Sequence, residues 1–220
     1  RAKVGQFDSD IGPPITLKLG AGDGHLYAVA TEAALFNYSG LTLDADKGTG
    51  LLTSEFLDDK TWAVPGGFAT PWRVTIVSPD LNGLVNSDIL TNLCPPAAER
   101  LFTKGMDTDW IRPGRCVWRW WARGTGNPKQ ERKYVDFAAE LGYEYSLIDG
   151  GWESWEKPWK TLRSIVSYAD KKGVDIWVWK RWNQIKNQDE RRRFFRRVKN
   201  AGVVGVKIDF MNKESQSRTM

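Results

Sequence analysis

Hydrophobic and polar residues follow two different patterns along the chain, and the change falls between residues 101 and 115. In the first hundred residues, short runs of alternating or β-branched residues are separated by clusters rich in glycine, proline, aspartate and asparagine. These runs cover residues 15–19, 26–30 and 72–77. Many short strands with frequent turns are typical of an antiparallel β-sandwich. We therefore predict that residues 1–100 form the end of such a sandwich.

From residue 116 onward, strand-like runs alternate with amphipathic helical periods. The helical periods end at Gly142, Gly173 and Gly202, which are 31 and 29 residues apart and are suited to the position that follows a helix. The strand-like runs cover residues 116–121, 143–149, 174–180 and 203–209. A helix–glycine–strand unit of this size predicts βαβ connections and a parallel sheet.

Four such units make up half of a (β/α)8 barrel. The predicted fold class is therefore multidomain: the C-terminal part of an antiparallel β-sandwich, a linker at residues 101–115, and the first four βα units of an α/β (β/α)8 TIM barrel at residues 116–220. A doubly wound sheet is disfavoured, because residues 124–126 (GTG) are too short for the glycine-rich phosphate loop of that fold. Since the chain begins at Arg1 and stops after four units, we interpret it as an internal fragment.

Ionisable residues stand seven positions after each helix-ending glycine, namely Asp149, Lys180 and Asp209. Each lies at the C-terminal end of a predicted strand, and in a barrel those ends carry the active site. Side chains two apart on a strand share a face, so Lys207 is expected to point the same way as Asp209. A carboxylate beside an ammonium group stays ionised, as a nucleophile requires. The same count places Asp149 and Lys180 on the inward face.

The chain contains 12 tryptophans, and nine of them lie in residues 111–220. Indole rings pack on the apolar face of a pyranose, so this enrichment favours a sugar ligand. Trp152 and Trp182 follow the second and third predicted strands, and we expect them to line the sugar site. The register count turns Trp177 and Trp179 outward, toward the helices, where they would pack in the core.

Charge divides the chain as well, with a net −6 in residues 1–110 and +11 in residues 111–220. The basic run at residues 190–199 contains Phe194, Phe195 and Val198 at helical spacing, so its arginines would form the solvated face of an outer helix. We therefore predict no nucleic-acid partner. The hydrophobic fraction of 41% and the charged fraction of 27% are ordinary for a globular protein, and no apolar run is long enough to span a membrane. The oligomeric state stays open.

Several segments, taken in order, resemble glycoside hydrolase family 97. They are residues 31–40 (TEAALFNYSG), 70–73 (TPWR), 107–114 (DTDWIRPG), 134–139 (YVDFAA) and 205–209 (GVKID). The resemblance implies an N-terminal β-sandwich, a (β/α)8 catalytic barrel, a smaller C-terminal β domain and a calcium ion in the active site. It further implies a bacterial enzyme that acts on α-glucosides or α-galactosides and is periplasmic or secreted.

The resemblance also implies a choice between two mechanisms. Inverting members of the family have a non-nucleophilic residue at the end of strand four, whereas retaining members, which look like α-galactosidases, carry an aspartate nucleophile there. This position is Asp209 here, and Lys207-x-Asp209 is similar to the nucleophile strand of the related α-galactosidase clan. We therefore expect a retaining α-galactosidase in which Asp209 is the nucleophile. Lys207, Asp149 and Lys180 would bind sugar hydroxyls.

The sequence does not contain a convincing match for two features that the resemblance implies, the acid/base glutamate and a complete set of calcium ligands. The acid/base glutamate of the family lies later in the barrel, and Glu214 is too close to Asp209 in sequence to reach the other side of the glycosidic bond. Glu32 matches a family glutamate that binds calcium, but calcium takes 6–8 oxygen ligands, so one residue cannot define the site. We expect this chain alone to be inactive. The open alternatives are an α-glucosidase of the same family and a non-catalytic carbohydrate-binding protein.

Overall fold

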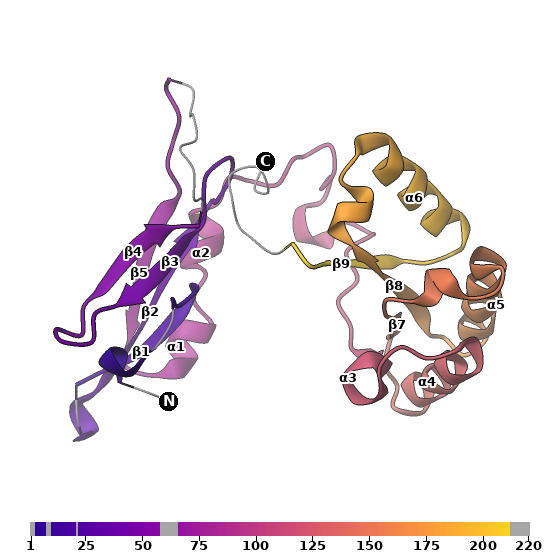
Figure 1. Cartoon of the computed structure of the whole chain (residues 1–220), viewed down its shortest axis with the longest axis horizontal. Coiled ribbons are helices and arrows are strands. Elements are labelled where there is room, and N and C mark those ends of the chain that lie inside the picture. Colours follow the sequence, from indigo (N-terminus) through magenta and orange to yellow (C-terminus); the bar gives the residue numbers. More distant parts are fainter. Residues whose placement is uncertain (1–2, 8–9, 21, 58–65, 212–220) are drawn as a thin grey trace. The chain divides into compact units, whose positions relative to one another are not determined.

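The computed structural model describes residues 3–7, 10–20, 22–57 and 66–211 (Figure 1). Its contacts divide the chain into two compact units, one within Arg1–Gly105 and the other formed by Met106–Met211. Among the described residues, no helix combines the length and the apolar character needed to cross a membrane.

The first unit contains two antiparallel sheets, as the sequence predicted. One sheet has the strand order β1–β2–β5, and the other pairs β3 with β4. The strands are β1 (Ile15–Leu19), β2 (Leu26–Ala33), β3 (Leu41–Ala45), β4 (Leu52–Phe56) and β5 (Trp72–Ser78). Alternation along these strands buries Ile15, Ala28 and Ile76. Short helices accompany them: η1 (Val4–Gln6), η2 (Gly22–Gly24), α1 (Leu81–Val85) and α2 (Ile89–Asn92). The 3-10 turn η3 (Gly105–Asp107) spans the boundary between the two units in the sequence.

The second unit is a parallel sheet with the strand order β6–β7–β8–β9, in which helices connect each strand to the next along the chain (Figure 1). The strands are β6 (Cys116–Trp118), β7 (Tyr145–Ile148), β8 (Asp175–Arg181) and β9 (Gly205–Asp209). The helices are α3 (Arg119–Arg123), α4 (Pro128–Glu140), α5 (Pro158–Asp170) and α6 (Gln188–Asn200), with the 3-10 turns η4 (Trp152–Ser154) and η5 (Trp182–Ile185). The predicted fold class is confirmed, although the first strand is shorter than expected because residues 119–121 are helical.

Local sequence explains where the main helices begin and end. The side chain of Asn127 caps α4 and that of Asn187 caps α6 by accepting hydrogen bonds from first-turn backbone N–H groups. Gly142, Gly173 and Gly202 follow the helices with φ of 64°, 70° and 81°, a left-handed conformation that favours glycine. The predicted helix ends are confirmed.

The core of the second unit lies between the sheet and the helices. Its fully buried members include Val135 and Ala138 of α4, Leu162 and Ile165 of α5, and Val178 of β8. These residues come from the periodic positions of each helix and from one face of the strand, so burial of the amphipathic stripes holds the unit together.

The two faces of β8 are the reverse of the prediction. Trp179 pairs in register with Lys207, and Lys180 pairs with Ile208. Residues opposite each other on neighbouring strands share a face. Trp177 and Trp179 therefore lie on the face of Lys207, and Lys180 lies on the face covered by helices, so the predicted inward direction of Lys180 is wrong.

The error comes from the connection before β8. Tyr145, the first residue of β7, stands three positions after Gly142, but its partner Asp175 stands only two positions after Gly173. Counting the same number of residues from each glycine therefore shifts β8 by one position. A shift of one residue moves every side chain to the other face of the sheet.

Gly205 provides a test of this register. A Cβ atom at Gly205 would overlap the indole of Trp177 from the neighbouring strand. We expect Gly205→Ala to lower the free energy of unfolding by about 1–3 kcal/mol through overpacking, measured by urea denaturation. Gly12→Ala is the control, because a Cβ at Gly12 meets open space. Equal stability of the two variants would contradict the observed pairing of β8 with β9.

Candidate active site

Two carboxylates and one lysine meet at the carboxyl ends of β7 and β9. Asp149 follows β7 directly, and Lys207 and Asp209 share one face of β9. The Nζ atom of Lys207 lies 2.7 Å from Oδ2 of Asp209 and 3.7 Å from Oδ2 of Asp149. The ammonium group therefore bridges the two carboxylates, and the structure brings together three of the residues that the sequence singled out.

Two indoles hold the same carboxylates. Nε1 of Trp118 donates to Oδ2 of Asp149 at 2.7 Å, and Nε1 of Trp179 donates to Oδ2 of Asp209 at 3.1 Å. The Lys207 Nζ atom also lies 4.4 Å from the centre of the Trp118 ring, a cation–π contact. Sequence reasoning missed both tryptophans as site residues. A correct register for β8 would have found Trp179, because it is paired with Lys207.

Asp209 is ionised and accessible. Its pKa is lowered from the ordinary value of 3.8 to about 2, first by the hydrogen bond from Lys207, then by the Phe210 backbone N–H and by Trp179. The Asp209 side chain is 40% exposed, whereas that of Asp149 is 8% exposed. Of these two carboxylates, Asp209 is thus the more accessible and Asp149 the more buried.

The residue after Asp209 fixes its second oxygen. Phe210 has φ 60°, which is uncommon for a bulky residue, and its backbone N–H donates to Oδ1 of Asp209 at 2.8 Å. Its ring packs edge-on against Trp179, with 5.8 Å between ring centres. Strained backbone often accompanies functional residues. Both oxygens of Asp209 therefore have defined partners.

The lowered pKa of Asp209 gives a testable pH dependence. Because the folded pKa lies below the ordinary value, the interactions of Asp209 stabilise the protein above about pH 4, and this stabilisation is lost as the pH falls toward about 2. We expect Lys207→Met to raise the pKa of Asp209 toward its ordinary value, measured by 13C NMR titration of the carboxyl group. Lys180→Met is the matched control, since Lys180 lies on the other face of the sheet. An unchanged pKa in Lys207→Met would contradict the assigned contact.

Lys180 was predicted for the site but is not brought to the cluster. Its Nζ atom lies 2.8 Å from both carboxylate oxygens of Glu153, on the helix-covered side of the sheet. Trp152 is fully buried in the core, so it has no surface for a sugar. Trp182 is half-buried in η5 after β8, with Nζ of Lys186 at 5.8 Å from its ring centre, and its contact with a sugar stays a prediction.

The predicted calcium ligand belongs to the first unit. Glu32 of β2 forms an ion pair with Arg73, its partner in register on β5, and Oε2 of Glu32 accepts a hydrogen bond from the Leu41 backbone N–H at 3.2 Å. No group of three or more His, Cys, Asp or Glu side chains able to hold a metal occurs in the part of the chain that the structure describes. Calcium requires 6–8 oxygen ligands. Glu32 alone does not define a calcium site, and its role as a calcium ligand stays a prediction. Glu214 lies outside the described residues.

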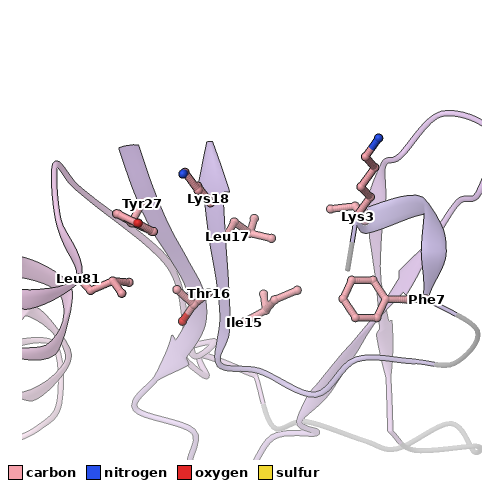
Figure 2. Close-up of a pocket in the computed structure, with 9 residues that line it drawn as sticks. Lys3, Phe7, Ile15, Thr16, Leu17, Lys18, Tyr27 and Leu81 are labelled. Carbon is pink, nitrogen blue, oxygen red and sulfur yellow. The ribbon is translucent and has the colours of Figure 1, made fainter. Parts of the chain in front are cut away.

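A cavity of about 700 Å³ in the first unit lies between η1 and β1 (Figure 2). Figure 2 shows Lys3 and Phe7 on one side of it and Leu17 and Lys18 of β1 on the other. The residues that line it are Lys3, Val4, Phe7, Ile15, Thr16, Leu17, Lys18, Tyr27 and Leu81. None of the described residues in this lining is a carboxylate, so they do not provide the paired carboxyl groups that glycoside hydrolysis requires.

Comparison with known proteins places both halves of the chain in one family. Residues 2–96 match the family described as Glycosyl-hydrolase 97 N-terminal, and residues 115–220 match Glycoside hydrolase 97. A probable retaining alpha-galactosidase of Streptomyces bingchenggensis is 33% identical over 204 residues, which cover 86% of this chain and 31% of that protein. A retaining alpha-galactosidase of Bacteroides thetaiotaomicron is 28% identical over 243 residues, which cover 93% of this chain and 35% of that protein.

A solved structure agrees with these matches. The crystal structure of a beta-arabinopyranosidase superposes with a TM-score of 0.71 at 28% identity, covering 89% of this chain and 35% of that chain. The chain thus spans about a third of the length of the curated relatives that it matches.

Proposed function

Because the chain belongs to glycoside hydrolase family 97, we propose that it supplies the nucleophile and part of the sugar site of a retaining glycosidase that cleaves terminal α-galactosides. The resemblance predicted from its motifs is confirmed. The observation that supports this function best is the ionised, accessible carboxylate of Asp209, held by Lys207 and Trp179. One similar protein is described as a retaining alpha-galactosidase and another as a probable retaining alpha-galactosidase, which supports the choice of reaction and sugar.

The proposed reaction proceeds by two displacements at the anomeric carbon. Asp209 attacks this carbon while a second carboxyl group protonates the leaving oxygen, and a glycosyl ester forms. Water, activated by the same second group, then hydrolyses the ester. In retaining enzymes the two carboxyl groups are about 5–5.5 Å apart. The Asp149 side chain is only 8% exposed, whereas that of Asp209 is 40% exposed, so we assign Asp149 to binding and not to proton transfer.

Lys207 has two roles in this reaction. Its ammonium group keeps Asp209 ionised and draws Asp149 toward the same point, which fixes the distance between nucleophile and binding group. A substrate hydroxyl placed between these residues would accept a hydrogen bond from Lys207. The acid/base carboxyl, export of the enzyme and any calcium ligands besides Glu32 would come from parts of the protein beyond the described residues.

A second candidate substrate is a β-arabinopyranoside. The matching solved structure is described as a beta-arabinopyranosidase. β-L-Arabinopyranose has the ring configuration of α-D-galactose and lacks its sixth carbon, so one site can accept both sugars. An α-glucoside differs from an α-galactoside in the orientation of the fourth hydroxyl group.

The test uses the full-length protein that contains this chain. Hydrolysis of 4-nitrophenyl α-galactoside, α-glucoside and β-L-arabinopyranoside is measured in parallel, and 1H NMR follows the first anomer released. We expect the α-galactoside to have the highest kcat/KM and the first product to be α-galactose. A β first product would overturn the retaining mechanism, and inactivity toward all three substrates would favour a non-catalytic carbohydrate-binding protein.

A further inference from the structure

A cavity of about 570 Å³ lies where α4 and α5 begin. The residues that line it are Pro128, Arg132, Trp155, Glu156, Lys157, Lys160, Thr161 and Ser164. Both helices follow parallel strands, so their first turns lie at the end of the unit where the carboxyl ends of β6 and β7 enter loops. The cavity shares no residue with the Asp149–Lys207–Asp209 cluster, and it is an open depression in which one face of a bound ligand would stay exposed to solvent.

The lining carries three cationic side chains, Arg132, Lys157 and Lys160, and one carboxylate, Glu156. Glu156 and Lys157 form an exposed pair, with 3.6 Å between Oε1 and Nζ, which leaves a surplus of positive charge. Compact anions are the ligands that such a surplus attracts, and an arginine binds the two oxygens of a carboxylate or sulfate with parallel hydrogen bonds.

Arg132 is held in a fixed position at this cavity. Its Nη2 atom donates to Oγ of Ser164 at 2.7 Å, and its Cζ atom lies 5.6 Å from the centre of the Tyr168 ring. The guanidinium has five N–H donors in total, so it can bind an anion while it keeps the contact with Ser164. A fixed arginine loses less conformational entropy on binding than a mobile one.

Trp155 gives the cavity an apolar wall. Its Nε1 atom donates to the Gly126 carbonyl at 3.2 Å, so the indole N–H is already bonded to protein and the ring is anchored. The ring is half-buried and packs against the core. Anchored indole surfaces are suited to the C–H face of a pyranose.

We propose that this cavity binds a pyranose that carries a carboxylate or sulfate group, with Trp155 against the ring and with Arg132 and Lys160 at the anion. The lining has one carboxylate, Glu156, and not the pair of carboxyl groups that glycoside hydrolysis requires, so we expect the site to bind an acidic sugar without cleaving it. Its place beside the loops that follow β6 and β7 would let it hold an acidic unit of a polysaccharide. The proposal does not depend on hydrolysis at Asp209, because binding to this chain can be measured directly.

Isothermal titration calorimetry at low salt tests the proposal with four probes: methyl α-galactosiduronate, galactose 6-sulfate, methyl α-galactoside and inorganic sulfate. We expect at least one of the two acidic sugars to bind at least tenfold more tightly than both the neutral glycoside and inorganic sulfate, and this preference to shrink as salt is added. The stronger acidic sugar identifies the anion that the site takes. Equal affinity for neutral and acidic sugars would overturn the proposal, and so would equal affinity for inorganic sulfate, which would show an anion site without sugar recognition.

Variants of this chain assign the binding to the cavity. Arg132→Gln and Lys160→Gln are each expected to weaken binding of the acidic sugar about tenfold. Lys133→Gln is the matched control on α4, since Lys133 is exposed and is not part of the lining, and its affinity should be unchanged. Trp155→Phe keeps an aromatic wall and should retain most of the affinity. The same loss in Lys133→Gln as in Arg132→Gln would overturn the site.

Discussion

Replacement of Asp209 by alanine is expected to reduce the kcat of the full-length protein toward an aryl α-galactoside by roughly 10⁴-fold or more, as loss of an enzymatic nucleophile does. The structure supplies the reason. Asp209 is the accessible carboxylate of the cluster, its pKa is lowered to about 2, and Lys207, Trp179 and the Phe210 N–H hold its oxygens. Alanine removes the group that would form the glycosyl ester.

Chemical rescue separates this role from a structural one. Azide fits the space left by the carboxylate and would attack the anomeric carbon of an activated α-galactoside from the nucleophile's side. The expected product is β-galactosyl azide, identified by NMR. Asp170→Ala is the control, since Asp170 is exposed at the end of α5 and far along the chain from the cluster. A near wild-type rate in Asp209→Ala, or low activity without azide rescue, would contradict the assignment of the nucleophile.

The parts of the site that follow from local rules were predictable from the sequence. Lys207 and Asp209 are two residues apart on one strand, so their shared face requires only the period of a β-strand. Gly142, Gly173 and Gly202 mark the helix ends because a left-handed residue is favoured there. From these features alone, the parallel sheet and the position of Asp209 at a strand end could be derived.

The parts that depend on pairing between strands were not predictable in the same way. The residue that faces Lys207 on β8 depends on how many residues separate Gly173 from the first paired position, and this number differs by one from that at β7. The bonds from Trp118 to Asp149 and from Trp179 to Asp209 join residues about 30 positions apart. No periodicity within one strand contains that information.

The buried position of Trp152 shows why residue type alone does not predict whether a tryptophan binds sugar or packs in the core. An indole suits a sugar platform and a hydrophobic core equally well, because both need a flat apolar ring with one polar edge. The short turn η4 directs Trp152 into the core, where its Nε1 atom donates to the Trp179 carbonyl at 3.1 Å and its ring meets Trp159 edge-on at 5.0 Å. Only the course of the chain after Asp149 distinguishes the two roles.

Trp152→Ala is therefore expected to lower the free energy of unfolding of the second unit by about 3–5 kcal/mol, a large share of the roughly 5–15 kcal/mol typical of a domain. Trp152 is fully buried, so its removal leaves a cavity, and it also leaves the Trp179 carbonyl without its indole partner. Urea denaturation of this chain, followed by circular dichroism, measures the change.

Trp121→Ala is the matched control, because the Trp121 side chain is 78% exposed and its loss should change the unfolding free energy by about 0.5 kcal/mol or less. A sugar-platform role for Trp152 predicts the opposite result, with stability nearly unchanged and only sugar affinity reduced. The Trp152 indole bonds to the backbone of Trp179, and the Trp179 side chain in turn bonds to Asp209, so this core residue also lies next to a residue of the candidate site. Equal stability of the Trp152 and Trp121 variants would contradict the core assignment and restore Trp152 as a candidate sugar ligand.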